Sequence, residues 1–178
     1  MKRNATLFFT ALALAAAPAV FGQGSPSKKQ FVKTDLMTGY QEVVAGTISS
    51  IATGEFVAEI DDEADIITYT LTYANIEGGG PTVAHIHFGA RGTTGGVSAF
   101  LCGGGGKPPC PPVSGSVTDI ITRNDVVGPN AQGIEATNFE EFVLAIRSGV
   151  TYVNVHSTRF PGGEIRGQIH DHNERQVK

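Results

Sequence analysis

Residues 54–73, GEFVAEIDDEADIITYTLTY, decide the fold class. In residues 54–60 apolar side chains alternate with Glu and Val, and from Ile67 to Tyr73 every second residue is large, with threonines between. A period of two is typical of a β-strand with one face against a core. The acidic turn DDEAD (61–65) joins the two stretches. Together they predict an antiparallel hairpin.

The same pattern recurs on both sides of this hairpin, separated by glycine and proline turns. These further stretches are 31–37, 40–45, 82–89, 97–101, 113–122, 151–157 and 163–170. One helix is expected near 138–148, where apolar residues recur at helical spacing and Thr137 and Glu140 have the spacing of a capping box. The chain is therefore expected to be all-β, an antiparallel Greek-key-like β-sandwich with one short helix.

Composition agrees with one β-rich domain. The chain has 178 residues, 23 glycines, 9 prolines and no tryptophan, and 17% of its residues are charged. This length is typical of one domain with appendages. The folded part is long enough to bury a sizeable core without a partner.

The N-terminal segment differs from the rest. A basic start is followed by an apolar run from Leu7 to Ala17 and then by small residues. This pattern predicts a secretory signal peptide over 1–22, cleaved after Gly22. The alternative, a membrane anchor, would need a longer apolar run. Export to the periplasm or the extracellular space is expected, with no integral membrane segment in the mature chain.

Two polar segments are expected to flank the domain, which is placed at 31–170. Residues 23–30 predict a flexible linker, and residues 171–178 predict a polar C-terminal tail.

Charge excludes some partners. Loss of Lys2 and Arg3 with the signal peptide takes the basic residues from 13 to 11 against 17 acidic residues, a net charge of −6. A chain this acidic, without a basic stripe, is a poor candidate for binding nucleic acid or an anionic membrane.

The two cysteines, Cys102 and Cys110, flank the loop GGGGKPP. In an exported protein a single pair is expected to form a disulfide. In the chain-entropy model, a disulfide that closes a loop of this size stabilises the folded protein by roughly 2.5 kcal/mol. The alternative, a redox or ligand pair, normally uses the closer C-x-x-C spacing.

Four segments together resemble the CHRD domain, which is named from chordin. They are GYQEVV, the ATGEFVAEI–ITYTLTY pair, VAHIHFGARGTTGGV, and FVLAIRSGVTYVNVHSTRFPGGEIRGQI. The resemblance runs from Phe31 to His170. It implies a β-rich, extracytoplasmic, non-catalytic binding module whose partner is an unknown protein or a ligand of the cell envelope or matrix. The chain departs from the family pattern in lacking a proline after QEV and in the insertion CGGGGKPPCPP.

Histidines are the candidate site. His85 and His87 alternate with Ala84 and Ile86 in a strand, so both imidazoles project from one face. His156, in YVNVHS, also lies on the polar face of its strand. If the two strands are neighbours, three imidazoles meet, which suits copper or zinc.

The alternative for these histidines is a structural one, in which they serve as surface residues or hydrogen-bond the glycine loop. The three-histidine arrangement is also distantly similar to the copper side of Cu/Zn superoxide dismutase, which leaves redox activity or metal handling as an alternative function. Such a likeness between folds does not by itself assign a function.

Two further features are expected to lie at the surface. His170 and His172 form a second H-x-H pair near the C-terminus, where a solvated tail is expected. Glu164 and Arg166 share a strand face and are expected to form a surface ion pair. Motifs of serine hydrolases, phosphate-binding loops and zinc proteases are absent from the sequence.

Overall fold

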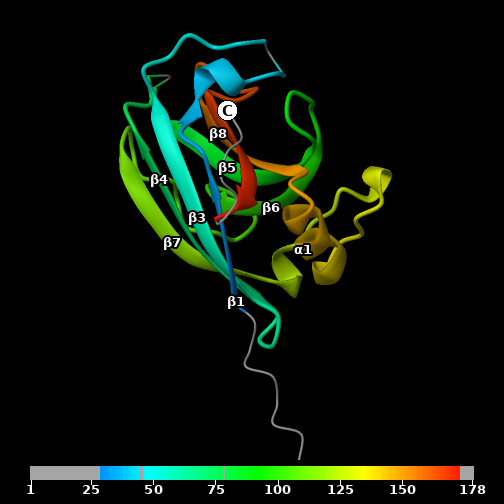
Figure 1. Cartoon of the computed structure of the whole chain (residues 1–178). Coiled ribbons are helices and arrows are strands. Elements are labelled where there is room, and N and C mark those ends of the chain that lie inside the picture. The colour runs from blue at the N-terminus through cyan, green and yellow to red at the C-terminus, as the bar shows by residue number, and fades with distance from the viewer. Residues whose placement is uncertain (1–28, 45, 78, 173–178) are drawn as a thin grey trace, which may run out of the picture.

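The computed structural model describes residues 29–172 except 45 and 78. The described residues form nine strands and one α-helix (Figure 1). The strands are β1 (Lys29–Thr34), β2 (Met37–Thr38), β3 (Thr53–Asp61), β4 (Ile66–Ala74), β5 (Pro81–Phe88), β6 (Gly96–Cys102), β7 (Gly115–Thr122), β8 (Thr151–Ser157) and β9 (Ile165–Asp171). The α-helix is α1 (Phe139–Arg147), and short 3-10 turns occupy Gly39–Gln41, Arg123–Asp125 and Asn130–Gln132.

The strands form one continuous antiparallel sheet that folds over itself into a sandwich. Its order is β6-β5-β8-β9-β1-β3-β4-β7, with β2 paired to both β3 and β9. Figure 1 shows β3, β4 and β7 in one layer and β5, β6 and β8 in the other. The chain crosses between the layers after β4, β6 and β7, which gives Greek-key-like connections. The expected all-β sandwich is confirmed.

The hairpin expected from residues 54–73 is β3 and β4, paired from Thr53–Ala74 to Asp61–Ile66. Its alternate side chains are buried between the layers, and the rings of Phe56 and Tyr69 stack with centroids 6.0 Å apart. The hydroxyl of Tyr69 donates to the carbonyl of Leu101 on the opposite layer, at 2.6 Å. The hydroxyl of Tyr73 likewise donates to the carbonyl of Pro111, so the core is apolar and the hydroxyls of these two tyrosines are hydrogen-bonded.

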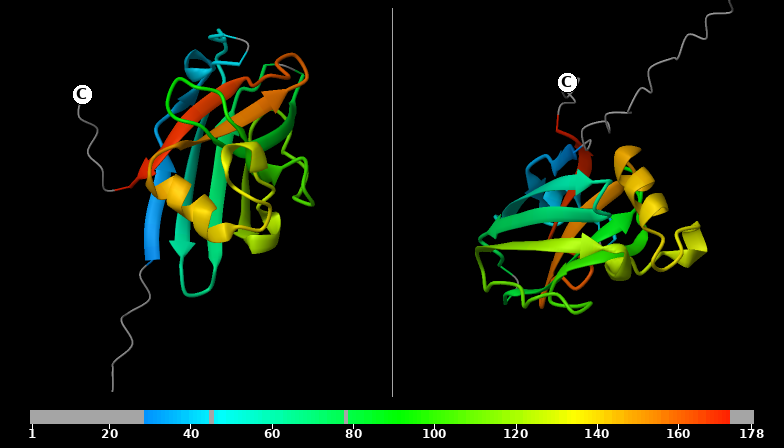
Figure 2. Two further views of the ribbon diagram at one scale, coloured as in Figure 1. Left: turned by 90° about the vertical axis from the view of Figure 1, so that its right-hand side faces the viewer. Right: turned by 90° about the horizontal axis from the view of Figure 1, so that it is seen from below.

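Helix α1 packs its apolar face against the core that the two layers share, and Arg147 at its end pairs with Asp62 in the turn between β3 and β4 (Figure 2). Its buried residues are those predicted to share a face, among them Phe142 and Ile146. The predicted capping box is wrong by one residue. Asn138 is the N-cap, and its side chain accepts a hydrogen bond from the backbone N–H of Glu141.

The disulfide between Cys102 and Cys110 is present and closes the loop between β6 and β7. Lys107 anchors this loop, since its Nζ atom lies 3.0 Å from an Asp125 carboxylate oxygen and 3.6 Å from one of Asp119. The side chain of Lys107 is only 6% exposed. The insertion is thus linked covalently to the end of β6, and shielded ion pairs join it to β7 and to the 3-10 turn that follows β7.

Several expected boundaries differ from the structure. The stretch expected to be extended at 40–45 instead begins in the 3-10 turn Gly39–Gln41, which turns the chain away from β2. Lys29 and Gln30, assigned to the linker, belong to β1, where Lys29 pairs with Asp61. Asp171, assigned to the tail, ends β9.

The signal peptide expected over 1–22 lies outside the described residues. Within residues 29–172, no helix is long and apolar enough to cross a membrane.

Candidate functional site

The layer that carries the histidines is buried on both faces. All seven residues of β8 are buried, as are six of the seven in β9. One face, with Ile86 and Val153, lies in the core. The opposite face is polar, and it is covered by the segments 39–44, 89–96 and 158–163 through hydrogen bonds from their backbone and side chains.

Strand pairing brings the three predicted histidines together. β5 pairs with β8, with His85 opposite Asn154, His87 opposite Tyr152, and His156 opposite Val83. His156 is therefore a diagonal neighbour of His85 on the same face. The pairing of β5 with β6 shifts register immediately before each of its two histidines, between Ala84 and His85 and between Ile86 and His87. Such register shifts change the direction in which the side chains beside them project.

The three imidazoles form a compact cluster. The Nδ1 atom of His85 lies 3.1 Å from the Nε2 atom of His87. The ring centroid of His156 lies 4.6 Å from that of His85 and 6.1 Å from that of His87. One ligand nitrogen from each ring lies within 4.8 Å of the other two. The residues predicted from the sequence are thus brought together as one group.

Backbone carbonyls set the tautomer of two rings. The Nδ1 atom of His87 lies 3.0 Å from the carbonyl oxygen of Gly95, and the Nδ1 atom of His156 lies 2.9 Å from that of Pro161. A carbonyl oxygen only accepts, so each Nδ1 must carry the proton and each Nε2 holds a lone pair. Backbone carbonyls commonly orient metal-binding histidines in this way.

Burial keeps the cluster neutral. Desolvation and the neighbouring imidazoles lower the pKa of His85 to about 3. Desolvation lowers the pKa of His87 to about 4, although its hydrogen bond to Gly95 opposes the shift. Burial also lowers the pKa of His156. At neutral pH the three rings are therefore neutral, which is the form that binds a metal ion.

One nitrogen in the cluster is left without a partner. The Nε2 atom of His156 is buried and makes no hydrogen bond with any described residue. A buried acceptor without a donor is unfavourable. The donor set of three neutral imidazoles fits copper or zinc, and it leaves a coordination position open for a further ligand.

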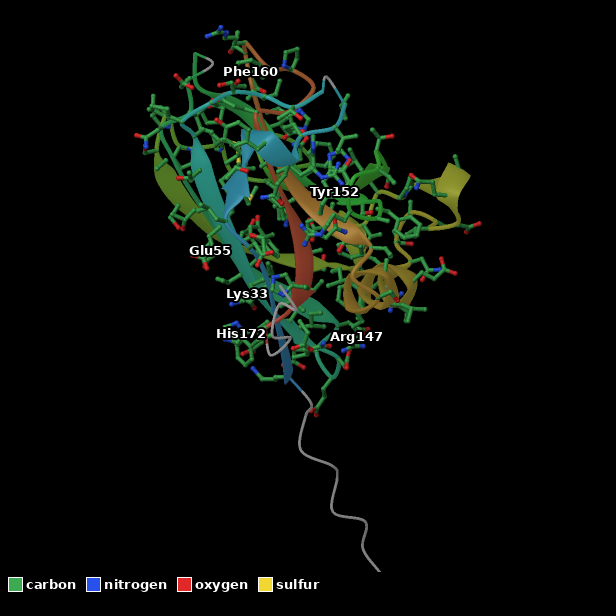
Figure 3. The ribbon with its side chains drawn as sticks, turned by 45° about the horizontal axis from the view of Figure 1, so that its top comes forward. Lys33, Glu55, Arg147, Tyr152, Phe160 and His172 are labelled. Atoms are coloured by element: carbon green, nitrogen blue, oxygen red, sulfur yellow. A yellow bond between two sulfur atoms is a disulfide. The ribbon has the colours of Figure 1, made fainter. Side chains whose placement is uncertain are left out.

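Aromatic rings form the walls of the cluster. The ring of His87 stacks on Tyr152 at 4.8 Å, nearly parallel, and Phe100 meets His85 edge-on at 5.0 Å. The hydroxyl of Tyr152 accepts from the backbone N–H of Gly95, the residue whose carbonyl orients His87. Figure 3 shows Tyr152 among the side chains gathered beside β8. These contacts hold the His87 ring by one face and by its Nδ1 atom, and the His85 ring by its contact with Phe100.

The prediction from sequence missed a second polar group beside the histidines. Asn154 donates to the carboxyl of Glu42, and the guanidinium of Arg166 lies over the other face of the Tyr152 ring, 3.4 Å from its centroid. Gln168 lies next to Arg166 on the same face of β9. The alternation of polar residues in RGQIH (166–170) was the available signal, since it matches that of YVNVH (152–156).

Two surface predictions are wrong. Glu164 and Arg166 are 0% and 2% exposed, and Glu164 instead accepts from the hydroxyl of Ser50 and from a backbone N–H at residue 77. His170 is 8% exposed and its Nε2 atom lies 3.2 Å from a carboxylate oxygen of Asp35. Both errors arise because segments distant in the sequence cover this face of the layer.

His170 and His172 stay apart from the three-histidine cluster. The side chain of His172 is exposed, and its backbone N–H donates to the carbonyl of Phe31.

Comparison with known proteins identifies the family. No curated protein and no solved structure matches the chain. A sequence model of the CHRD domain matches residues 34–169, which include the whole histidine cluster. The chain therefore belongs to the CHRD domain family.

Proposed function

We propose that this protein is a non-catalytic CHRD binding module in which His85, His87 and His156 hold one copper or zinc ion. The observation that carries the proposal is the unpartnered, buried Nε2 atom of His156 beside two further neutral imidazoles. The Nε2 atoms of His87 and His156 and the Nδ1 atom of His85 would be the ligand atoms, with the proton that His85 Nδ1 donates to His87 Nε2 moving to His85 Nε2 as the ion binds. When bound, the ion supplies a fixed positive charge and one open coordination position.

The spacing of the ligand atoms supports this proposal. Zinc–imidazole bonds of about 2.0–2.1 Å place ligand nitrogens roughly 3.3–3.6 Å from one another. The pair from His85 and His87 is already at 3.1 Å, and all three atoms lie within 4.8 Å. Small rotations of the His156 ring would complete the set. A purely structural role leaves its Nε2 atom unexplained.

Metal retention tests the proposal. Chelator-treated protein is mixed with one equivalent of Cu(II) or Zn(II) and desalted. Its metal content per chain is then measured by inductively coupled plasma mass spectrometry. About one ion per chain is expected, because three imidazoles form a tight site. The His87→Ala and His156→Ala variants should each lose most of the bound metal. The His172→Ala variant, which changes an exposed histidine outside the cluster, is the matched control. Retention at the wild-type level in both cluster variants would overturn the proposal.

Export is part of the proposed function. The basic start and apolar run of residues 1–22 support it, as does the disulfide between Cys102 and Cys110. Expression of the full chain in a bacterial host should give an extracytoplasmic product whose intact mass lacks residues 1–22. A cytoplasmic product of full mass would contradict export.

The partner of the module is proposed to be a protein or a ligand of the cell envelope or matrix, as its family membership supports. Immobilised protein should capture such a component from envelope extracts, and substitutions in the exposed part of segment 89–96 should weaken capture. Equal capture by the wild type and by these variants would remove this segment from the binding surface.

A further inference from the structure

A cavity lies beside the histidine cluster, on the other side of the Tyr152 ring. Its volume is about 270 Å³, and it lies between β9, the 3-10 turn after β2 and the segment that follows β5. Its lining residues are Tyr40, Gln41, Glu42, Val43, Arg91, Gly92, Arg166 and Gln168. A space of this size accommodates a small polar molecule.

Arg166 places a buried positive charge in the wall of this cavity, close to the carboxyl of Glu42. The residue is 2% exposed, its Nη2 atom donates to the carbonyl of Ala90, and its guanidinium lies over the ring of Tyr152. The Nη1 atom is buried and has no hydrogen-bond partner among the described residues. None of the ion pairs within the described ranges includes Arg166. Buried charges are normally paired, and burial leaves the nearby Glu42 carboxyl only partly ionised near neutral pH, so a further anionic partner is expected.

Gln168 adds an unsatisfied acceptor two residues along the same face of β9. Its Nε2 atom donates to the carbonyls of Gly89 and Gly149, at 3.0 and 2.9 Å. These two bonds fix the orientation of the amide, because a carbonyl cannot donate. The Oε1 atom is therefore a buried acceptor, and it has no partner among the described residues. It requires a donor from the ligand.

The charges around the cavity favour an anion. Arg91 lines it and keeps a loose contact with Asp35, at 3.7 Å. Glu42 is the acidic residue of the lining, and burial raises its pKa to about 7. Near neutral pH this carboxyl is therefore only partly ionised, while both arginines are charged.

We propose that this cavity binds a small oxyanion that carries a hydroxyl group, of the hydrogen phosphate or hydrogen carbonate kind. An oxygen of the anion accepts from the Nη1 atom of Arg166, and its hydroxyl donates to the Oε1 atom of Gln168. Arg91 adds a second positive charge at the mouth. The ligand thus satisfies both unpartnered atoms at once.

Pairs of ions of equal charge and similar shape test this proposal. Calorimetric titrations of chelator-treated protein compare hydrogen phosphate with sulfate, and hydrogen carbonate with nitrate. At least one hydroxyl-bearing ion should bind about tenfold or more tightly than its counterpart, because the counterpart leaves Gln168 unpaired. The tighter of the two hydroxyl-bearing ions identifies the ligand. Absence of binding, or equal binding within both pairs, overturns the proposal.

Substitutions then locate the site. Arg166→Gln should abolish binding, although loss of a buried group also threatens folding. Arg91→Gln is the safer variant, since this side chain is 59% exposed, and it should weaken binding severalfold. Arg159→Gln removes an exposed arginine outside the cavity and should change nothing. Equal weakening by Arg91→Gln and Arg159→Gln would mean a general effect of surface charge and would overturn the proposal.

Glu42→Gln provides a test in the opposite direction. The glutamine oxygen can still accept from Asn154, while the negative charge is gone, so the anion should bind more tightly than to the wild type. Weaker binding would contradict the placement of the anion. All these measurements use metal-free protein, so they succeed or fail independently of the proposed metal site.

Discussion

The β3–β4 hairpin and the β8–β9 hairpin have the same alternating sequence pattern but opposite surroundings. In β3 and β4 the outward side chains face solvent, and threonines there, such as Thr72, hydrogen-bond to neighbours on β7. In β8 the outward residues Tyr152, Asn154 and His156 are buried too, at 1%, 2% and 9% exposed.

This difference shows where function is concentrated in the sandwich. On the exposed layer water can satisfy any polar group, so an alternating polar residue there carries little information. On the covered layer each polar atom must find a partner within the protein. Among the described residues, the buried side-chain atoms that find none are on Ser98, Thr151, His156, Arg166 and Gln168, and the last three lie at the sites proposed for a metal ion and an anion.

The largest expected effect is on the pH dependence of stability. His85 and His87 have pKa values of about 3 and 4 in the folded protein, against 6.5 in the unfolded chain. Below pH 6.5 the unfolded chain binds protons that the folded protein does not, so the free energy of unfolding falls as the pH falls. The two residues together contribute about 2–2.5 kcal/mol per pH unit between roughly pH 6 and 4.5.

Denaturant titrations of chelator-treated wild type and of the His85→Gln/His87→Gln double variant measure this slope. Glu42, with its raised pKa, acts in the opposite sense between about pH 4.5 and 7, but it is present in both proteins. The difference between them therefore isolates the histidines, and His172→Gln is the control. Parallel pH profiles would mean that the cluster is hydrated rather than buried.

A matched pair of substitutions compares the two layers directly. Asn154→Ala removes the donor to the Glu42 carboxyl and to the carbonyl of Ile165, in a dry environment. It should lower the free energy of unfolding by about 2–3 kcal/mol. Thr72→Ala removes a hydroxyl from the exposed layer and should cost about 0.5 kcal/mol or less. A similar loss in the free energy of unfolding for both variants, measured by denaturant titration, would contradict the claim that the two layers differ in their exposure to water.

A smaller effect is expected where the covering segment meets this layer. Gly163 has φ 123°, and a Cβ atom there would lie 2.5 Å from the Asn154 amide nitrogen and 2.7 Å from a Glu42 oxygen. Gly133 also has positive φ, 97°, but its Cβ would meet nothing within 4 Å. Alanine is strained by the positive φ at both positions, but only at Gly163 does its Cβ also collide with neighbouring side chains. Gly163→Ala should therefore lower the free energy of unfolding by roughly 1–2 kcal/mol more than Gly133→Ala. Equal melting temperatures would show that the cover is loosely packed.

Much of the fold was predictable because it follows from local pattern. The alternation in residues 54–73 predicted β3 and β4, and the apolar face of residues 139–146 predicted α1. The grouping of His85, His87 and His156 was also predictable, since it needed only the strand faces and one pairing, β5 with β8. The distant likeness to Cu/Zn superoxide dismutase stays a prediction.

The cover over the second layer could not be predicted. The burial of Arg166 and His170 depends on residues 35–43 and 89–96, which are far away in the sequence. Local pattern assigns a polar face to solvent unless tertiary contacts intervene. The second polar group, around Glu42 and Arg166, was missed for the same reason.

The most direct test of the central claim is a crystal structure of the protein loaded with zinc, with the ion located by anomalous scattering. We predict one ion bonded to His85 Nδ1, His87 Nε2 and His156 Nε2 at about 2.0–2.1 Å. The 3.1 Å contact between His85 and His87 would then be replaced by two bonds to the ion. A fully loaded crystal in which that contact persists and the ion lies elsewhere would contradict the account.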